Sequence, residues 1–215
     1  MLERLMLEGR RVRLEPLTLD HVSLLEAAAG EGRGTYTYTW VPDGPEEARR
    51  YVEAALEHQQ SGRALVWAVR RLADNRIVGS TRFLDLEVFS WPPPWPPGVG
   101  RGQAPEEERP PTVCEIGSTW YAASVQRTGI NTEVKLLQLV HAFEVWQVVR
   151  VTFKTDARNE RSRRAIEGIG ARFEGVRRAH APATDGTIRD TAYYSILQIE
   201  WSAIKAELQR RCEER

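Results

Sequence analysis

The stretch from Ser124 to Gly170 places the tightest constraint on how this 215-residue chain can fold. A turn containing Gly129 precedes an apolar run at helical spacing, a β-branched strand follows at 148–155, and a polar turn leads into a second helix. A helix that begins after such a turn points free backbone N–H groups outward, and these donors and the helix dipole favour an anion. The stretch therefore predicts either a phosphate site or a plain turn–helix–strand–helix unit.

Composition and charge favour a folded protein without a strongly charged partner. Of the residues 41% are hydrophobic, enough for a sizeable core, and the formal net charge is zero, so no bulk field favours nucleic acid or a membrane surface. Cys114 and Cys212 provide neither a disulfide framework nor a metal-binding spacing. The first residues lack a long apolar run, and we expect a cytoplasmic protein with no membrane partner, no direct nucleic-acid binding and no metal.

The order of periodic segments predicts an α+β protein, an α/β/α sandwich with a mixed, mostly antiparallel sheet. Residues 11–17 alternate apolar and polar, Thr18 can cap the helix that follows, and residues 64–70 and 77–86 form a hairpin. The other expected elements are a helix at 45–60, strands at 113–121, 172–178 and 187–197, and a terminal helix at about 200–211. We expect one domain over residues 1–215.

The composition changes abruptly at about residues 90–112. Trp91 and Trp95 stand among five prolines, and glycines, three glutamates and further prolines follow. Proline lacks a backbone donor and fixes φ, so the segment predicts a long loop of polyproline character. It is either a tolerated surface insertion or a flap that docks a partner through its tryptophans.

The phosphate-site pattern and the second helix together resemble the GCN5-related N-acetyltransferase (GNAT) superfamily. Gln126, Gly129 and Asn131 match the loop pattern Gln/Arg-x-x-Gly-x-Gly/Ala, from which Asn131 departs at the last position. Residues 154–171, which read KTDARNERSRRAIEGIGA, resemble the RimJ/RimL-type subfamily that acetylates N-terminal amines of ribosomal proteins. The resemblance runs from about residue 7 to residue 205 and is interrupted near residues 91–111.

This resemblance implies a splayed sheet and acetyl-CoA as the co-substrate. The strand at 113–121 would diverge from the strand at 148–155, and the pantetheine arm of CoA would bond to the backbone of Ile116 and Gly117 between them. Asn159 would bond the pantetheine or cap the second helix. The loop residues whose N–H groups would hold the CoA pyrophosphate are Gln126, Arg127, Thr128, Gly129, Ile130, Asn131 and Thr132.

Acetyl transfer to an amine needs a neutral nucleophile, a stabilised carbonyl oxygen and a proton for the departing thiolate. The family often carries its base on the strand at 113–121, where Glu115 is the only carboxylate. The alternative is that Glu115 is an ordinary strand residue that faces solvent. Glu174 and His141 are the other candidates, although His141 lies in the middle of the core helix.

The related subfamily places a serine three residues after the asparagine, facing the sulfur, and in this chain that residue is Ser162. The alternative for Ser162 is capping chemistry in the first turn of a helix. Many superfamily members use a tyrosine whose position matches Ile166, which has no proton to give. Tyr194 is therefore the reserve acid, or else a packed strand aromatic.

Tyr36, Tyr38 and Trp40 alternate in the segment that helps to wall the acceptor pocket in the family. They predict either an aromatic wall for the acceptor or a short edge strand that packs its rings on the body of the protein.

The resemblance implies an enzyme that transfers acetyl from acetyl-CoA to a primary amine by direct transfer in a ternary complex. The favoured acceptor is a protein or peptide N-terminal amine, whose reference pKa of about 7.7–8.0, against about 10.4 for lysine, requires only a modest base. Two other functions stay open: acetylation of small amines such as polyamines, amino sugars or drugs, and a non-catalytic acyl-CoA-binding module. The acceptor and a homodimeric state are also left open.

Overall fold

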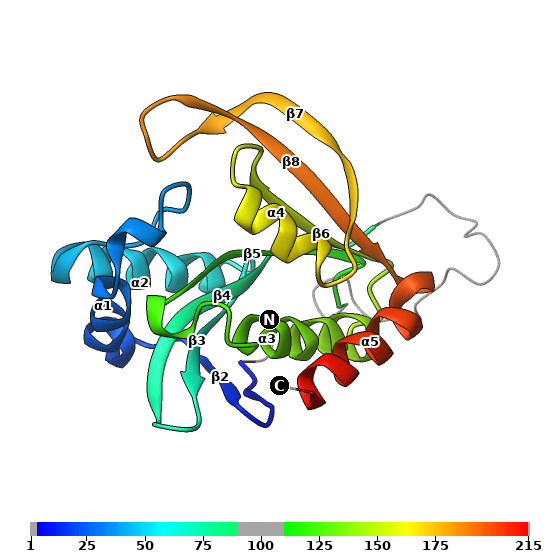
Figure 1. Cartoon of the computed structure of the whole chain (residues 1–215), viewed down its shortest axis with the longest axis horizontal. Helices are drawn as coiled ribbons and strands as arrows, with labels where there is room; N and C mark the ends of the chain where they lie inside the picture. The colour runs from blue at the N-terminus through cyan, green and yellow to red at the C-terminus, as the bar shows by residue number, and fades with distance from the viewer. Residues whose placement is uncertain (1–3, 90–109, 215) are drawn as a thin grey trace.

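The sheet predicted from the sequence forms the centre of the structure. The computed structural model describes residues 4–89 and 110–214 (Figure 1). Within them, eight strands form one sheet in the order β1-β2-β3-β4-β5-β6-β8-β7, and every neighbouring pair is antiparallel except β5 and β6. The expected mixed, mostly antiparallel sheet is therefore confirmed. The strands are β1 (Leu7–Glu8), β2 (Val12–Pro16), β3 (Leu65–Arg71), β4 (Arg76–Glu87), β5 (Val113–Tyr121), β6 (Arg150–Asp156), β7 (Arg172–Pro182) and β8 (Ile188–Leu197).

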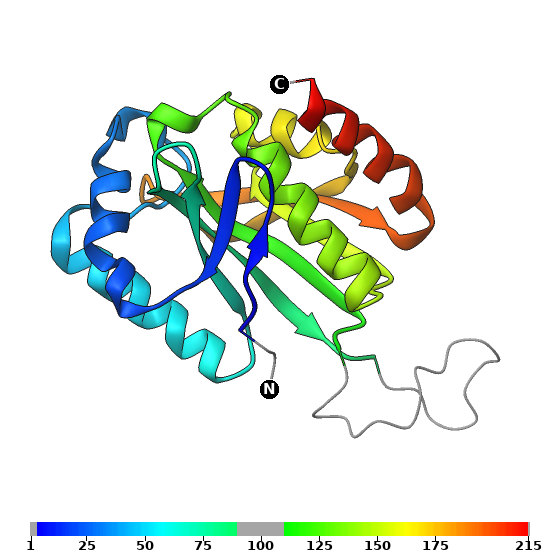
Figure 2. The same ribbon diagram turned by 90° about the horizontal axis from the view of Figure 1, so that it is seen from below.

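Helices cover both faces of the sheet (Figure 2). Arg82 and Phe83 are neighbours in β4 and point to opposite faces: Arg82 lies over Tyr51, and Phe83 packs on Trp146. Tyr51 belongs to α2, which contacts α1, whereas Trp146 follows α3, which contacts α5. These two pairs of helices therefore lie on opposite faces. The helices are α1 (Val22–Gly30), α2 (Gly44–Gln60), α3 (Ile130–Val140), α4 (Glu160–Glu167) and α5 (Trp201–Glu213).

The pairing of β5 with β6 is short. Their last pair is Glu115 with Thr152, and beyond it neither strand pairs with the other. β5 is also irregular in its pairing with β4, at a point where Ser118 takes a left-handed conformation with φ of 45°. The two strands thus diverge after Glu115 and Thr152, and we call this divergence the β5–β6 fork.

The aromatic residues at 36–40 do not form the edge strand that their alternation allows, so that prediction is wrong. The chain instead turns through a short 3-10 helix (Arg33–Thr35). The Arg33 guanidinium donates to the carbonyl oxygens of Val41 at 3.1 Å and Pro42 at 2.7 Å, which holds the segment folded back. Tyr36 is buried, and its hydroxyl donates to the carbonyl oxygen of Tyr121 at 3.0 Å. Side-chain contacts, not strand pairing, attach this segment to the end of β5.

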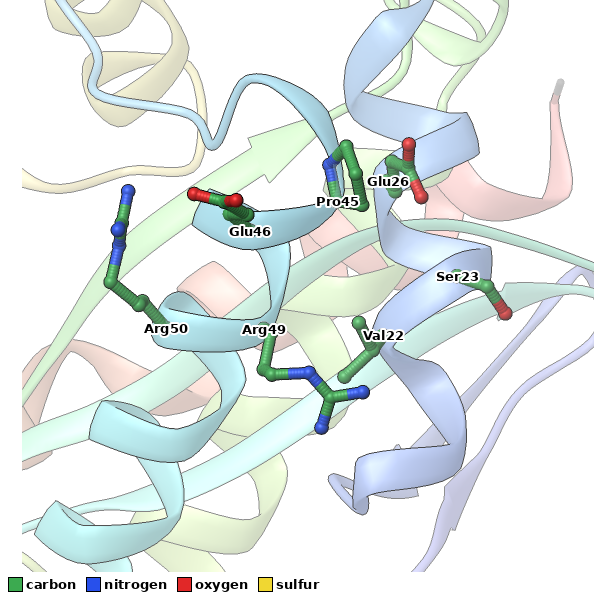
Figure 3. A pocket seen from close by; sticks show the side chains of 7 residues that line it. All are labelled: Val22, Ser23, Glu26, Pro45, Glu46, Arg49 and Arg50. Carbon is green, nitrogen blue, oxygen red and sulfur yellow. The ribbon is translucent and has the colours of Figure 1, made fainter.

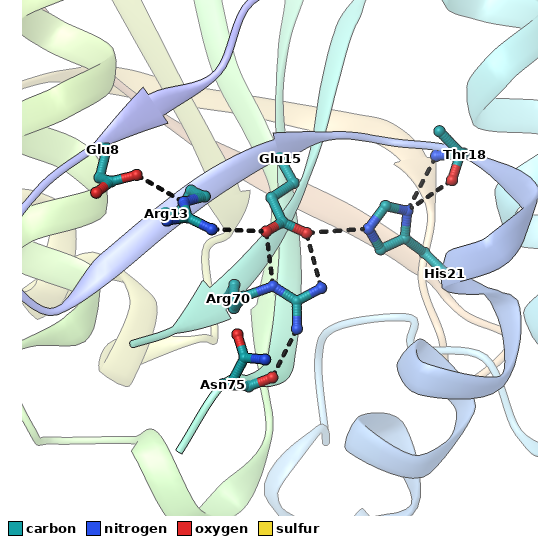
Figure 4. A network of polar contacts seen from close by, with 7 residues as sticks. All are labelled: Glu8, Arg13, Glu15, Thr18, His21, Arg70 and Asn75. Carbon is teal, nitrogen blue, oxygen red and sulfur yellow. Dashed lines mark hydrogen bonds and ion pairs between the residues drawn. The ribbon is translucent and has the colours of Figure 1, made fainter. Parts of the chain in front are cut away.

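An ion-pair network centred on Glu15 joins β2 to β3 and to the turn before α1 (Figure 4). Arg70 donates to both carboxylate oxygens of Glu15, at 2.6 and 2.8 Å. His21 Nε2 lies 3.4 Å from the same carboxylate, and Arg13 lies 3.6 Å from it. The hydrogen bond from Arg70 holds the pKa of Glu15 below its ordinary value, although burial opposes this. We call these four residues the Glu15 network.

The segment at about 90–112, which we predict as a loop, lies mostly outside the described residues. Its flanks are close together, because the Thr112 N–H donates to the Glu87 carbonyl oxygen at 2.7 Å. The Phe89 N–H also donates to the Thr112 hydroxyl at 3.1 Å. The described residues on the two sides of the segment therefore lie next to each other, at the end of β4 and the start of β5.

Candidate active site

Glu115 lies at the β5–β6 fork and is buried, so it does not face solvent as an ordinary strand residue would. Its Oε2 atom lies 2.7 Å from Nζ of Lys154 on β6, in an ion pair whose angles fall outside hydrogen-bond geometry. The same Lys154 also bonds to Asp85 at 3.0 Å. Burial raises the pKa of Glu115 to about 7, while Lys154 opposes the rise. A carboxyl of this acidity can accept a proton near neutral pH.

Gly117 leaves room for the Glu115 side chain. A Cβ atom at position 117 would lie 2.8 Å from Glu115 Oε1 and 3.0 Å from Leu84 Cδ1, so a larger residue would displace one of them. Ile116 and Gly117 pair with β4 on one side and follow the last β5–β6 pair on the other. Their backbone groups on the β6 side are therefore free of strand partners.

The loop before α3 presents backbone donors. Arg127 and Gly129 both take left-handed conformations, with φ of 65° and 91°, and Gly129 is the N-cap of α3. The Glu133 N–H donates to the Gly129 carbonyl oxygen at 3.2 Å, which is the first backbone hydrogen bond of the helix. The N–H groups of the loop residues before Glu133 therefore have no acceptor within the helix. The Thr128 hydroxyl donates to the Val125 carbonyl at 2.6 Å and holds the loop in place. Successive amides around left-handed residues form a concave site for anions.

Gln126 is held within the protein by its side chain. Its amide nitrogen donates to the Thr35 hydroxyl at 3.0 Å and to the Tyr121 carbonyl at 3.1 Å, and its backbone N–H bonds to Ala123. Its side-chain oxygen accepts a hydrogen bond from Arg161 of α4 at 3.0 Å. Arg161 also donates to the Thr35 carbonyl. Gln126 therefore connects the loop to α4, and the free loop amides begin at Arg127.

Asn159 and Ser162 stand at the start of α4. Asn159 is the buried N-cap, and its side-chain oxygen accepts the Ser162 N–H at 3.0 Å. The capping interaction thus uses the Asn159 side chain and the Ser162 backbone. The Ser162 hydroxyl forms no hydrogen bond with the described residues and is partly exposed. It is therefore available to a ligand.

Tyr194 is fully buried on β8, and its hydroxyl is engaged by α4. It accepts a hydrogen bond from Arg163 Nε at 2.8 Å and donates one to Glu167 at 3.1 Å. Its ring meets Phe173 edge-on, with the ring centres 5.3 Å apart. Tyr194 therefore anchors α4 to the sheet.

The two other candidate bases, Glu174 and His141, are engaged in contacts within the protein. Glu174 pairs with Arg150 and accepts the Ser195 hydroxyl at 2.7 Å, and the Arg150 hydrogen bond lowers its pKa. His141 packs against Trp146, with the ring centres 4.6 Å apart, and burial lowers its pKa to about 4. Neither lies on β5, whose carboxylate is Glu115.

Two of the surface hollows among the described residues have volumes of about 500 Å³ each. One lies between α1 and α2 (Figure 3), and none of the predicted site residues line it. The other is bounded by two residues of the loop region, Thr128 and Ile130, together with Arg10, Arg11 and Arg71. Positive charge therefore gathers beside the amides that favour an anion.

Comparison with known proteins decides the family. The sequence pattern of the acetyltransferase (GNAT) domain matches residues 11–172, about three quarters of the chain. The chain belongs to the GNAT acetyltransferase family. The match ends at the start of β7, so the β7–β8 hairpin and α5 fall outside it. One domain over residues 1–215 stays a prediction.

Individual relatives agree with this assignment. A GCN5-related N-acetyltransferase from Brucella melitensis is 30% identical, with a TM-score of 0.78 over 97% of this chain and 86% of that one. The Bacillus subtilis (strain 168) protein named "Putative ribosomal N-acetyltransferase YdaF" is 35% identical over 92 residues, 43% of this chain. That alignment spans about half, 49%, of the relative's length. The ribosomal L7/L12 α-N-protein acetyltransferase RimL, 17% identical with a TM-score of 0.69 over 90% of this chain and 94% of that one, shares the fold.

Four cations near the candidate site are not among the residues predicted from the sequence. Arg161 and Lys154 lie inside segments that the resemblance covers, but their partners come from other elements. Lys135 of α3 and Arg82 of β4 are both buried, although such residues usually face solvent. An interruption of the apolar pattern of a core helix, as at Lys135, was the signal in the sequence.

Among residues 4–89 and 110–214, no group of three or more His, Cys, Asp or Glu residues could hold a metal ion. Over the same described residues, none of the helices combines the length and the apolar character needed to cross a membrane.

Proposed function

We propose that this protein transfers the acetyl group of acetyl-CoA to the N-terminal α-amine of a protein or peptide, by direct attack in a ternary complex. The observation that carries the proposal is the position of Glu115, a buried carboxyl with a pKa of about 7 at the β5–β6 fork. The other end of the same strand leads into the donor-rich loop at Arg127 and Gly129. A candidate base and a candidate phosphate site thus stand at the two ends of β5.

The loop supports acetyl-CoA as the co-substrate. Residues 126–132 would hold the pyrophosphate, mainly through the free amides from Arg127 onward. The Arg127 side chain and the arginines of the neighbouring hollow add positive charge. Ile116 and Gly117 would bond the pantetheine amides with backbone groups that have no β6 partner. Asn159, which caps α4, would hold Ser162 close to the sulfur.

Glu115 would take the proton from the amine. Near neutral pH a substantial fraction of its carboxyl is ionised, and an N-terminal amine with a pKa of about 7.7–8.0 needs only such a modest base. The neutral amine would attack the thioester carbonyl carbon. A backbone N–H of β5 beside the fork would donate to the carbonyl oxygen as charge develops on it.

Ser162 would give a proton to the sulfur as the carbon–sulfur bond breaks. Its hydroxyl has no partner among the described residues, and it stands in the first turn of α4, where the helix dipole favours negative charge. Tyr194 is the reserve donor, although both of its hydroxyl contacts are to α4. The products are the acetylated amine and CoA with its thiol protonated.

The choice of a protein or peptide acceptor rests on two observations. The Bacillus subtilis relative carries a ribosomal N-acetyltransferase name. The acidity of Glu115 also matches the deprotonation of an α-amine better than that of lysine.

An acceptor screen tests the proposal. Purified protein with acetyl-CoA is offered a panel of peptides with free N-termini, peptides with blocked N-termini and a lysine, polyamines and amino sugars. Mass spectrometry of the products is expected to place the acetyl group on an α-amine. Acetylation confined to polyamines or amino sugars would replace the peptide acceptor with a small one. No CoA binding at millimolar concentration by calorimetry would overturn the enzymatic function.

A further inference from the structure

Arg82 of β4 is a buried cation without a counter-charge in the part of the chain that the structure describes. Its exposure is 6%, its Nε atom is buried without an acceptor, and it forms no ion pair with a carboxylate of residues 4–89 or 110–214. A guanidinium cannot lose its proton in a protein, so burial cannot be relieved by neutralisation. Burying a guanidinium whose Nε–H has no acceptor is costly unless an acceptor from outside compensates the charge.

Lys135, the other buried cation among the described residues, shows how the same chain satisfies such a group. Its Nζ atom donates to Thr119 at 2.9 Å, to Gln138 at 3.1 Å and to Thr81 at 3.3 Å. Burial also lowers its pKa to about 7, so it can become neutral. Arg82 has neither a hydrogen-bond acceptor among the described residues nor the ability to become neutral, and this points to a ligand.

The position of Arg82 places it beside the reaction. Arg82 of β4 pairs directly with Gly117 of β5. The Cα atoms of two residues paired in this way are about 5 Å apart. Leu84 pairs in the same way with Glu115, so Arg82 and Glu115 point to the same face of the sheet. On this face the guanidinium carbon of Arg82 lies over the Tyr51 ring, 5.1 Å from the ring centre.

The surroundings of Arg82 select the kind of anion. The guanidinium carbon lies over the Tyr51 ring, and the N–H donors of a guanidinium point outward in its own plane, where the terminal nitrogens can meet a ligand. A planar carboxylate matches the edge of a guanidinium with two parallel hydrogen bonds. A phosphate would bring more negative charge close to Glu115 and Asp85. These two carboxylates already share Lys154, so the added charge would repel them.

We infer that Arg82 binds a carboxylate of the acceptor, so that this protein acetylates amines that carry a carboxylate a few bonds from the reacting nitrogen. This rests on the proposed function. Two sources share the chemistry: the acidic side chain of a residue near a peptide N-terminus, and the α-carboxylate of a free amino acid. Arg82 is a specificity-determining residue, and Glu115 remains the base.

Matched acceptors test the inference. The peptide pair is Ala-Asp-Ala-Ala amide and Ala-Asn-Ala-Ala amide, and the small pair is alanine and alaninamide; each pair differs by one carboxylate. In the wild-type protein kcat/KM is expected to be roughly 10- to 100-fold higher for the carboxylate member of at least one pair, the scale of a charge-assisted hydrogen bond. The pair that shows the preference identifies the source of the carboxylate.

Arg82→Met should reduce this preference to near one, chiefly through a higher KM for the carboxylate member. Arg82→Lys should restore part of it, because the charge remains while the two-pronged geometry is lost. Arg70→Met is the matched control, since Arg70 is also largely buried but is paired with Glu15 in the Glu15 network. It should lower stability and leave the preference unchanged.

The outcomes separate the two claims. Acetylation with equal kcat/KM within both pairs, or a preference that survives Arg82→Met, overturns the role of Arg82 and leaves the proposed function standing. If Arg82 only supports the fold, its variants lower both members of a pair equally. Failure to acetylate any amine of the acceptor screen overturns the proposed function, and this inference with it.

Discussion

Glu15 and Glu115 are both largely removed from water, and their surroundings shift their acidity in opposite directions. Glu15 accepts two hydrogen bonds from Arg70 and has Arg13 and His21 nearby, and its pKa is lowered. Among the described residues Glu115 pairs with one cation, Lys154, which it shares with Asp85, and burial raises the pKa of Glu115 to about 7. Glu15 is therefore kept ionised and stabilises the fold, whereas Glu115 has a pKa at which it can exchange a proton near neutral pH.

The two glutamates also have opposite effects on stability as the pH changes. For Glu15 the folded pKa lies below the unfolded value, so its stabilisation is complete above about pH 4.5 and is lost as the pH falls through the folded pKa. For Glu115 the folded pKa lies above the unfolded value, so the fold loses stability as the pH rises towards and through about 7. The pH dependence of the free energy of unfolding therefore distinguishes the ion-paired Glu15 from the proton-exchanging Glu115.

The largest effect is expected from Glu115→Gln. An amide cannot accept the proton of the amine, so kcat should fall by about 10²- to 10⁴-fold, the range for a positioned base. The wild-type rate should rise with pH through about 7, as the carboxylate forms, and the variant should lose this dependence. Steady-state kinetics between pH 6 and pH 9 measure both.

The melting temperature of the same variant provides the control. At pH 8 Glu115→Gln should be at least as stable as the wild type, because it no longer buries an ionised group with one shared cation. A fully active variant with the wild-type pH profile would remove Glu115 from the mechanism and end its contrast with Glu15.

The next largest effect is expected from Ser162→Ala, which should lower kcat by about 10²-fold if Ser162 protonates the thiolate. Stability should hardly change, because the cap is made by the Asn159 side chain and the Ser162 backbone. Asn159→Ala should instead cost about 1 kcal/mol of stability and weaken CoA binding. Turnover, calorimetry with CoA and melting on both variants separate the roles. A stable, fully active Ser162→Ala would leave Tyr194 or solvent as the proton donor.

Glu15→Gln should act on stability alone. The free energy of unfolding should fall by about 2 kcal/mol at pH 7, the scale of a hydrogen bond to a charged group that loses its partner. Turnover per folded molecule should stay at the wild-type level, because the Glu15 network lies outside the β5–β6 fork. Urea unfolding at pH 7 and pH 4 should show a smaller difference between variant and wild type at pH 4. An equal difference at both values would mean that the charge of Glu15 contributes nothing.

Local patterns predicted most of the fold. The hairpin expected at 64–70 and 77–86 is β3 and β4, since alternation and the Asp74-Asn75 turn act over a few residues. The pattern failed at 36–40, because contacts of Arg33 to Val41 and Pro42 decide the course of that segment. Such contacts between side chains and distant carbonyls leave no periodic signal.

The candidate site was less predictable than the fold. The family resemblance pointed to Glu115, but its burial and its pairing with Lys154 depend on how β5 and β6 meet. Gln126 stays a predicted cofactor-binding residue, and the contact of its side chain with Arg161 of α4 has no signal in the sequence. Arg82 lies in an ordinary strand pattern, and it is distinguished only by the burial of its Nε atom without an acceptor among the described residues.

The smallest effect is expected from deleting residues 91–109 and joining the ends with a short turn. The Thr112 N–H and the Glu87 carbonyl lie 2.7 Å apart, so the flanks already meet as in a hairpin, and loop length alone changes stability by about 1 kcal/mol or less. The pH dependence of turnover should also be unchanged if β5, β6 and Lys154 set the acidity of Glu115. Melting and the pH–rate profile of the shortened protein test this. A melting temperature many degrees lower would place the tryptophans of the segment in the core, and a shifted pH profile would make the segment part of the surroundings of Glu115.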